Sequence, residues 1–183
     1  MTDPETIPGW FRAADADPIA AGCRMIGATG TLLEIGTWCG RSTAMLAQRL
    51  PEWNIWTVDA YLRDAVEFWG RDLPNHPQAL AAENLAGIAN VRRIVADSLD
   101  APFYLPRPPD ALFIDGDHTR ERVALELRRF LPWLPAHAAV WIHDCDWIGV
   151  LDGIDDGMPS GWDRVPAYEC EAQFLRCYRR AQT

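Results

Sequence analysis

Two short polar clusters follow apolar runs in the sequence, and their side chains are of the kinds that move protons and bind cations. The first, DGDH, holds Asp115 and His118, and the second, HDCD, holds His143 and Asp144. A histidine with an ordinary pKa near 6.5 can accept a hydroxyl proton at neutral pH. Carboxylate oxygens are the ligands that a hard cation such as Mg²⁺ prefers. Proton removal, cation binding or both are therefore the chemistry that these residues could support.

The composition removes several other kinds of chemistry. All 17 basic residues are arginine, which excludes a lysine nucleophile, Schiff base or general base. The five cysteines contain no CxxC pair and are odd in number, so neither a zinc ribbon nor a disulfide framework is indicated. The net charge of -9 argues against nucleic acid as a partner, since nucleic-acid binding needs clustered basic charge. A small or neutral substrate is expected.

A glycine turn stands between an apolar run and a helical pattern in LLEIGTWCGRSTAMLA, residues 32–47. Gly36 and Gly40 would let the backbone approach a ligand where a Cβ would clash. Such a turn in an open parallel sheet is a common ligand site. The G-x-x-x-G spacing differs from the G-x-G-x-x-G dinucleotide fingerprint, and the chain lacks the P-loop pattern. The turn is therefore expected to hold a ligand without phosphates.

Polar residues at the ends of later strands suggest a nucleoside. Asp59 lies 23 positions after Gly36, close to the ~20-residue offset at which a carboxylate reaches a ribose diol. Asp97 and Ser98 end the third predicted strand, where a side chain could accept a hydrogen bond from an adenine amino group. Adenosine joined to a charged amino acid fits this set.

The elements that must position these residues follow from the alternation of short apolar runs with longer helical patterns. This alternation predicts a parallel sheet covered by helices on both faces. The predicted strands are 31–36, 54–60, 90–98, 110–118 and 138–144, and the predicted helices are 17–28, 41–50, 77–88 and 119–134. The first helix would take Asp17 as its N-cap and Pro18 as its first residue. The C-terminal fifth predicts an antiparallel pair, and the length of 183 residues fits one domain.

The glycine turn resembles motif I of the class I S-adenosylmethionine (SAM)-dependent methyltransferases, particularly the catechol O-methyltransferase-like branch. The segment from ALFIDGDH to WIHD is similar to the signature of methyltransferase family 24, and the two matches span about residues 30–146. The resemblance implies a single-domain, Rossmann-like α/β fold, with a mostly parallel seven-stranded sheet, an antiparallel C-terminal hairpin and helices on both faces. Its parts would be an N-terminal helical segment (1–29), a cofactor-binding core (30–146) and a C-terminal hairpin region (147–183).

The resemblance also implies a SAM-dependent O-methyltransferase that acts on a hydroxyl of a small molecule such as a sugar, a phenol or a natural-product intermediate. The residues that it places around SAM are Glu34, Gly36, Trp38, Gly40, Ser42, Asp59, Asp97, Ser98 and Asp115. The first five would surround the methionine part, with Ser42 near its carboxylate. Asp59 would hold the ribose hydroxyls, and Asp97 with Ser98 the adenine edge.

In the topology of the family, Asp115 and Asp144 would face one small volume suited to Mg²⁺ or Mn²⁺. Catechol-type relatives carry asparagine where Cys145 stands, and His143 occupies the place of an acid in the sugar enzymes, so His143 is a tentative third ligand. Metal dependence stays open, and Asp144 could instead cap a helix or hold a loop. His118 stands where relatives carry a catalytic lysine or histidine, which makes it the expected base, with a role at the start of the next helix as the alternative.

The remaining expectations concern the acceptor and the setting of the protein. Trp10, Trp69, Trp147 and Trp162 fall outside the predicted strands, where they could line an acceptor pocket or pack helices onto the sheet. Residues 60–77 are long enough for a lid. The polar N-terminus and the short apolar runs favour a cytoplasmic protein without a membrane partner. A homodimer whose second copy completes the pocket is a further expectation. The alternatives are a non-catalytic SAM-binding regulatory or partner protein and a nicotinamide-dependent oxidoreductase.

Overall fold

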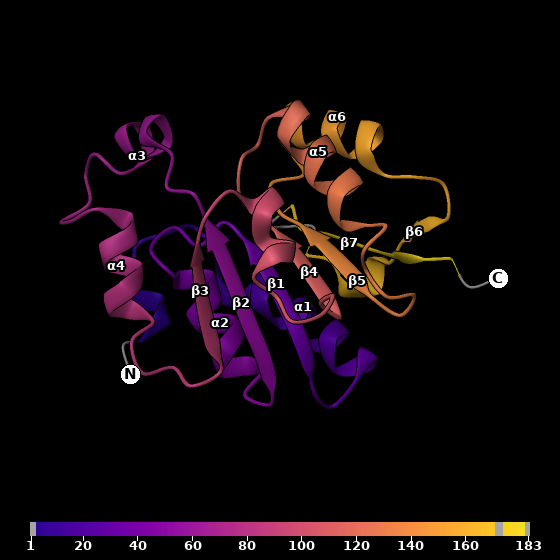
Figure 1. The fold of residues 1–183 in the computed structure, drawn as a ribbon, viewed down its shortest axis with the longest axis horizontal. Coiled ribbons are helices and arrows are strands. Elements are labelled where there is room, and N and C mark those ends of the chain that lie inside the picture. Colours follow the sequence, from indigo (N-terminus) through magenta and orange to yellow (C-terminus); the bar gives the residue numbers. More distant parts are fainter. Residues whose placement is uncertain (1–2, 171–173, 182–183) are drawn as a thin grey trace.

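One seven-stranded sheet organises the part of the chain that the computed structural model describes, residues 3–170 and 174–181. The strand order is β3-β2-β1-β4-β5-β7-β6 (Figure 1). The strands are β1 (Gly30–Ile35), β2 (Trp53–Asp59), β3 (Val91–Val95), β4 (Ala111–Ile114), β5 (Ala139–Ile142), β6 (Trp162–Arg164) and β7 (Arg176–Arg180). Strands β1 to β5 are parallel, whereas β7 runs antiparallel to both β5 and β6. The predicted fold class is confirmed.

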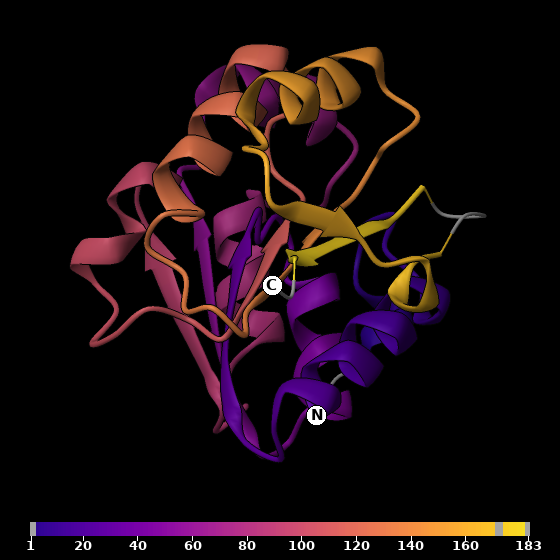
Figure 2. The ribbon, with the colours of Figure 1, turned by 90° about the vertical axis from the view of Figure 1, so that its right-hand side faces the viewer.

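Helices cover both faces of this sheet. They are α1 (Ala13–Ile26), α2 (Arg41–Arg49), α4 (Pro77–Asn84), α5 (Arg120–Phe130) and α6 (Ile148–Gly157), whereas α3 (Arg63–Trp69) lies in the connection between β2 and α4. Buried side chains of α1, α2 and α4 share one apolar cluster with β1, and those of α5 and α6 share a second with β4 and β5. Figure 2 shows α1 and α5 on opposite sides of the sheet. No helix among the described residues is long and apolar enough to cross a membrane.

The strand register brings the polar clusters together at the carboxyl ends of the parallel strands. Ile114 pairs with Ile142, so the residues that follow β4 and β5 leave the sheet side by side. Ile35 pairs with Val58 and with Ile114, which places the glycine turn and the end of β2 at the same edge. The expected adjacency of Asp115 and Asp144 follows from this register.

The first helix begins earlier than the sequence predicts. Asp17 and Pro18 lie inside α1 rather than at its start, because Arg12 is the N-cap and its N–H donates to Asp15 Oδ2 at 2.8 Å. Pro18 cannot donate a hydrogen bond within the helix. Burial of the apolar side of α1, which includes Ile19, offsets this loss.

The C-terminal region differs from the predicted hairpin in two ways. Helix α6 precedes the hairpin, and Trp162 lies in β6 rather than outside the strands. The α6 sequence, IGVLDGIDDG, has a low helix propensity because it contains three glycines. Two of them allow close packing: an added Cβ at Gly153 would lie 2.6 Å from Val123 Cβ, and one at Gly157 would lie 2.8 Å from Ala124 Cα. We call this contact between α5 and α6 the glycine seam.

Candidate active site

The turn after β1 lies against the tip of β4. Gly36 and Gly40 have φ angles of +97° and +88°, which favour glycine. A Cβ at Gly36 would lie 2.0 Å from the Asp115 carbonyl oxygen, and one at Gly40 would lie 2.9 Å from Leu85 Cγ. The sequence predicted that these glycines approach a ligand. In the structure their closest approach is to the protein itself: the backbone contact at Gly36 and the positive φ at both positions favour glycine without a ligand.

Asp59 fixes the geometry of this turn from the end of β2. Its Oδ2 accepts a hydrogen bond from the N–H of Trp38 at 2.8 Å, and its Oδ1 accepts one from the N–H of Tyr61 at 2.7 Å. The Tyr61 hydroxyl donates to the Trp38 carbonyl at 3.2 Å. Burial raises the pKa of Asp59. Because a carboxylate offers about four acceptor positions, Asp59 keeps acceptor capacity beyond these two bonds.

Glu34 lies beneath the turn and is fully buried. Its Oε2 accepts a hydrogen bond from the Thr43 hydroxyl, whereas its Oε1 has no hydrogen-bond partner among the described residues. Burial raises the pKa of Glu34 to about 7, against the opposing effect of nearby hydroxyls that include Ser42. Buried polar atoms normally have partners, so an unpaired oxygen beside the turn is a feature to explain.

Asp97 and Ser98 belong to a network with helix α5. Arg122 contacts Asp97 Oδ1 and Ser98 Oγ, each at 2.5 Å. Ser98 also lies 2.5 Å from Glu126 Oε1, and Glu126 is buried. The contact with Arg122 lowers the pKa of Asp97. Sequence reasoning missed this network, although Arg122 and Glu126 stand four residues apart on a helix, the spacing at which such pairs meet.

Asp115, His118 and Asp144 converge at the tips of β4 and β5. One candidate ligand atom from each lies within 4.8 Å of the other two. His118 Nε2 is 2.9 Å from Asp144 Oδ2, but this buried ring nitrogen makes no hydrogen bond of good geometry with any residue that the structure describes. Two carboxylates and an unsatisfied imidazole nitrogen are a donor set that fits a divalent cation.

The charges of this group depend on one another. Burial opposes a charged His118, but contact with the Asp144 carboxylate outweighs it and raises the pKa of His118. Burial likewise opposes ionisation of Asp144, but contacts with His118 and His143 hold the pKa of Asp144 well below its usual range. Burial raises the pKa of Asp115. An ionised Asp144 beside a basic His118 is the resulting arrangement.

His143, the tentative third metal ligand, lies beside this three-residue group, and its role as a ligand stays a prediction. Its Nδ1 is 3.2 Å from Asp144 Oδ2 and 3.6 Å from Asp115 Oδ1, and its Nε2 is 3.5 Å from Asp15 Oδ1. Burial opposes a charged His143, but these carboxylates outweigh it and raise its pKa to about 11. His118, which the sequence assigned as the base, joins Asp115 and Asp144 as a further candidate ligand. Cys145 is buried in the core, with its thiol 3.3 Å from the Ile142 carbonyl.

Sequence reasoning also missed Asp15. This fully buried carboxylate of α1 reaches His143 from a segment far away in the sequence. Its burial could not be predicted, because the pattern of residues 17–28 placed the helix start after it. The signal that could have found it is its position three residues after the N-cap, where an acid accepts the N-cap N–H.

Three of the four singled-out tryptophans gather near His118. The ring centroids of Trp147 and His118 are 4.9 Å apart, those of Trp69 and Trp147 are 6.3 Å apart, and those of Trp10 and Trp69 are 5.6 Å apart. Trp69 ends α3 within residues 60–77, and Trp147 caps the start of α6. Residues 60–77, the expected lid, therefore reach the neighbourhood of the candidate base.

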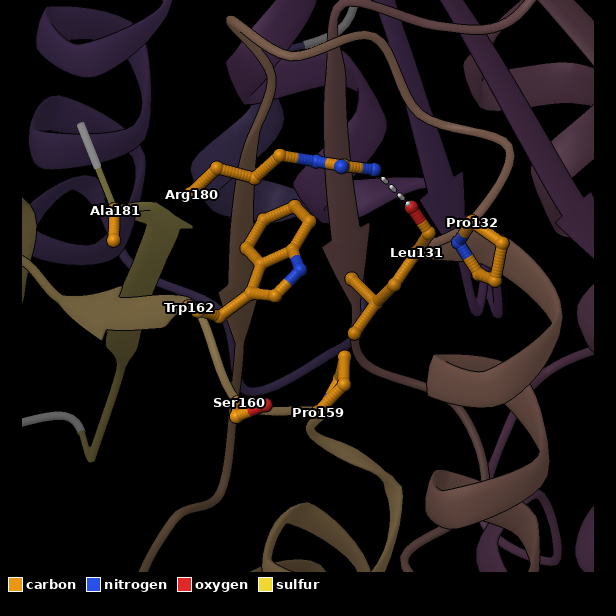
Figure 3. Close-up of a pocket in the computed structure, with 8 residues that line it drawn as sticks. Leu131, Pro132, Pro159, Ser160, Trp162, Arg180 and Ala181 are labelled. Carbon is orange, nitrogen blue, oxygen red and sulfur yellow. Dashed lines mark hydrogen bonds between the residues drawn. The ribbon is translucent and has the colours of Figure 1, made fainter. Parts of the chain in front are cut away.

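The fourth, Trp162, lines a cavity of about 390 Å³ at the opposite end of the strands (Figure 3). Arg180 lies over the Trp162 ring at 5.4 Å and donates to the Leu131 carbonyl at 3.0 Å. Because β7 is antiparallel to β5, with Arg179 opposite Ala139, this cavity lies near the amino ends of the parallel strands. It is separate from the group around His118.

Comparison with known proteins agrees with the fold. Residues 33–145 match the model of methyltransferase family 24, described as a methyltransferase domain. No curated protein sequence matches the chain.

Solved structures share the fold at low sequence identity. A proposed O-methyltransferase from Klebsiella pneumoniae is 19% identical to this chain, with a TM-score of 0.68; the match covers 96% of this chain and 84% of the Klebsiella chain. An rRNA methylase from Streptococcus thermophilus is 16% identical, with a TM-score of 0.62; the match covers 96% of this chain and 100% of the Streptococcus chain. A methyltransferase from Podospora anserina with S-adenosylhomocysteine (SAH) bound is 14% identical, with a TM-score of 0.62; the match covers 97% of this chain and 92% of the Podospora chain.

Proposed function

The chain belongs to methyltransferase family 24, a family of SAM-dependent methyltransferases, and from that premise we propose that it methylates a hydroxyl group of a small molecule. The observation that carries this proposal is the convergence of His118, Asp115 and Asp144 at the sheet edge that also bears the glycine turn. A hydroxyl acceptor needs a group that removes its proton, and this edge offers one.

SAM would lie along this edge of the sheet. Its methionine part would meet the turn formed by Gly36, Trp38 and Gly40, with Ser42 at the start of α2. The unpaired oxygen of Glu34 fits a cofactor whose methionine part carries an ammonium group. The remaining acceptor capacity of Asp59 supports its role at the ribose hydroxyls.

The adenine end of SAM would meet Asp97 and Ser98. Asp97 is exposed, and its contacts with Arg122 hold it in one position. This fixed acceptor beside β3 supports the role in recognising the adenine edge. Asp115, whose carbonyl lies against Gly36, would complete the SAM site.

His118 would act as the general base. The leaving thioether of SAM is neutral, so methyl transfer requires only that the acceptor hydroxyl lose its proton and point at the methyl group. Asp144 faces Nε2 of His118, which leaves Nδ1 for the acceptor proton. Because the carboxylate raises the pKa of His118, it makes the imidazole a stronger base.

A divalent cation is a second element of the proposal. Asp115, Asp144 and His118 would hold it, and the bound ion would polarise the acceptor hydroxyl. An imidazole ligand favours Mn²⁺ over Mg²⁺ at such a site. A His118 that binds the cation cannot also take the proton, so the cation and the histidine base are alternative ways to activate the acceptor.

Calorimetric titration of the protein with SAM and with SAH tests the proposal. The titrations are run after EDTA treatment and again with Mg²⁺ or Mn²⁺ restored. Micromolar binding of both ligands is expected, followed by turnover in a screen of hydroxylated acceptors. Failure to bind either ligand in every condition would refute the SAM site, and binding without any turnover would favour the non-catalytic alternative. Activity that survives chelation would remove the cation from the mechanism.

A further inference from the structure

The tryptophan strip, defined as Trp10, Trp69 and Trp147, is an apolar surface beside the proposed base. Its three side chains come from three separate segments, and adjacent rings lie 5.6 and 6.3 Å apart. They are 65%, 43% and 43% exposed, respectively. Indole side chains are large enough that contiguous exposed ones mark a contact surface.

Hydrogen bonds to backbone carbonyls hold the two ends of this strip in place. Arg41 donates to the Phe11 carbonyl at 2.6 Å and to the Ile7 carbonyl at 2.9 Å, so the segment that carries Trp10 is tied to the start of α2. The N–H of Trp147 donates to the Asp144 carbonyl at 2.9 Å. The strip is therefore attached to the same elements that form the glycine turn and that carry Asp115 and Asp144.

The strip also meets the proposed reaction centre directly. Trp147 contacts the His118 ring, with the two planes tilted by 44°. At the other side, the end of α3 approaches the glycine turn, since a Cβ on Gly70 would lie 3.5 Å from the Trp38 ring. An apolar wall beside a few reactive polar groups is the usual composition of a small-molecule site.

The dimensions and charges of the strip define the acceptor that it fits. Two ring-to-ring steps make the strip longer than a single phenol ring, and indole rings attract flat aromatic groups by stacking and edge contacts. The carboxylates of Asp115 and Asp144 at its inner end disfavour an anionic acceptor. We propose that the acceptor is an uncharged hydroxyl compound with two or more joined aromatic rings, which lies along Trp10, Trp69 and Trp147 with its hydroxyl at His118. This inference rests on the proposed function and specifies its substrate class.

Binding of 2-naphthol to the SAH-saturated protein, measured by calorimetry, tests the inference. Phenol and methyl glucoside serve as the single-ring and non-aromatic comparisons. We expect 2-naphthol to bind more tightly than either. Trp10→Ala, Trp69→Ala and Trp147→Ala should each weaken it by about three- to tenfold, the size of an aromatic contact. SAH affinity should stay unchanged in all three.

Trp162→Ala is the matched control, because Trp162 lies at the other end of the strands and should leave 2-naphthol affinity unchanged. Trp147→Phe keeps an aromatic ring and should restore most of the affinity, which separates loss of a ring from loss of folding. Equal affinity for the three probes, or 2-naphthol affinity that the strip variants leave unchanged while SAH still binds, would overturn the inference. So would strip variants that change the mass of the protein in light scattering but not 2-naphthol binding, because the strip would then be the contact face of a second copy. If the wild-type protein does not bind SAH at all, the result would instead count against the proposed function.

Discussion

His118 has two unlike neighbours, the Asp144 carboxylate at 2.9 Å and the Trp147 indole at 4.9 Å between ring centroids. The carboxylate stabilises the charged imidazole, whereas the indole presents an apolar surface beside it. This combination suits a base that must hold a proton after taking it and still face an apolar acceptor.

Replacement of His118 by alanine tests its catalytic role. If His118 is the base, kcat should fall by about 10² or more, the usual contribution of a general base, while SAM affinity stays within a few-fold of the wild type. The measurement is steady-state turnover alongside calorimetric SAM binding. His137→Ala is the control, since His137 contacts Asp110 before β4 and lies outside the candidate site. Turnover of His118→Ala within a few-fold of the wild type would show that another group takes the proton.

The pH dependence of turnover tests the pairing of His118 with Asp144. Only neutral His118 can accept a proton, so kcat/KM measured with EDTA present should rise with pH through a pKa above 6.5. Asp144→Asn removes the carboxylate that raises this pKa, so the rise should move to lower pH. A rise that stays at the same pH in Asp144→Asn would contradict the pairing.

The same pair predicts how stability varies with pH. The raised pKa of His118 stabilises the fold below its unfolded pKa of about 6.5, and this contribution is lost as pH rises through the folded pKa. The lowered pKa of Asp144 stabilises the fold above its unfolded pKa of about 3.9. Urea unfolding should therefore show the largest difference between wild type and Asp144→Asn between about pH 4 and 6.5. A difference that grows above that window would be inconsistent with this origin.

At the scale of elements, the turn between β1 and α2 is the most constrained connection in the site. Gly36 has a φ of +97°, and a Cβ added to it would lie 2.0 Å from the Asp115 carbonyl oxygen. A backbone oxygen has no flexible end that can move aside. Any side chain at residue 36 must therefore separate the turn from β4.

Gly36→Ala should lower the unfolding free energy and abolish measurable SAM binding, because it displaces the turn from Asp115. Gly87→Ala is the matched control: Gly87 has a φ of +78° but no atom within 4 Å of an added Cβ. The control should show only the cost of the backbone conformation, about 1 kcal/mol, with SAM binding intact. Chemical unfolding and calorimetry provide the two measurements. Equal effects of the two substitutions would show that contact with Asp115 is unimportant.

Most elements follow from the sequence, and the exceptions have physical causes. The five parallel strands and α2, α4 and α5 follow from their apolar patterns. Strand β4 ends at Ile114 rather than near residue 118 because DGDH leaves the sheet at the site. Helix α6 was missed because its glycines, which favour a loop locally, are stabilised by packing on α5.

The site follows from the sequence where topology alone positions a residue. Asp59 ends β2, and Asp115 and Asp144 follow β4 and β5, all parallel strands of one sheet, so their common edge was predictable. The contacts of Asp15 with His143 and of Arg122 with Asp97 depend on how helices pack on the sheet. A one-dimensional pattern carries no information about those contacts.

At the scale of the whole molecule, the N-terminal segment closes over the start of α2. Besides its contacts with backbone carbonyls, Arg41 forms an ion pair with Glu5 at 2.7 Å, and Ile7 and Phe11 are buried in the core beneath. The segment, α1 and the sheet therefore share one apolar cluster with the glycine turn. A ligand at the turn should stabilise this whole assembly.

SAM should consequently stabilise the protein by mass action. At a concentration of 100 times its Kd, it should raise the unfolding free energy by about 2.7 kcal/mol, and thermal unfolding should move upward accordingly. Asp59→Ala should weaken this shift, because it removes both the proposed ribose contact and the hydrogen bond that fixes Trp38. Asp163→Ala, in edge strand β6, is the control and should show the wild-type shift. An unchanged shift in Asp59→Ala would remove Asp59 from the cofactor site.

The glycine seam between α5 and α6 bears on how this protein could be re-engineered or could evolve. The seam continues to the proposed reaction centre, since a Cβ on Gly149 would lie 2.4 Å from the His118 carbonyl. A larger residue anywhere along it would push α6 away and displace His118 and Trp147 together. A mutant library aimed at new acceptors should therefore leave residues 149, 153 and 157 constant and vary the exposed tryptophans. Diversity at those tryptophans should change the proposed substrate surface without altering the helix pair that aligns it.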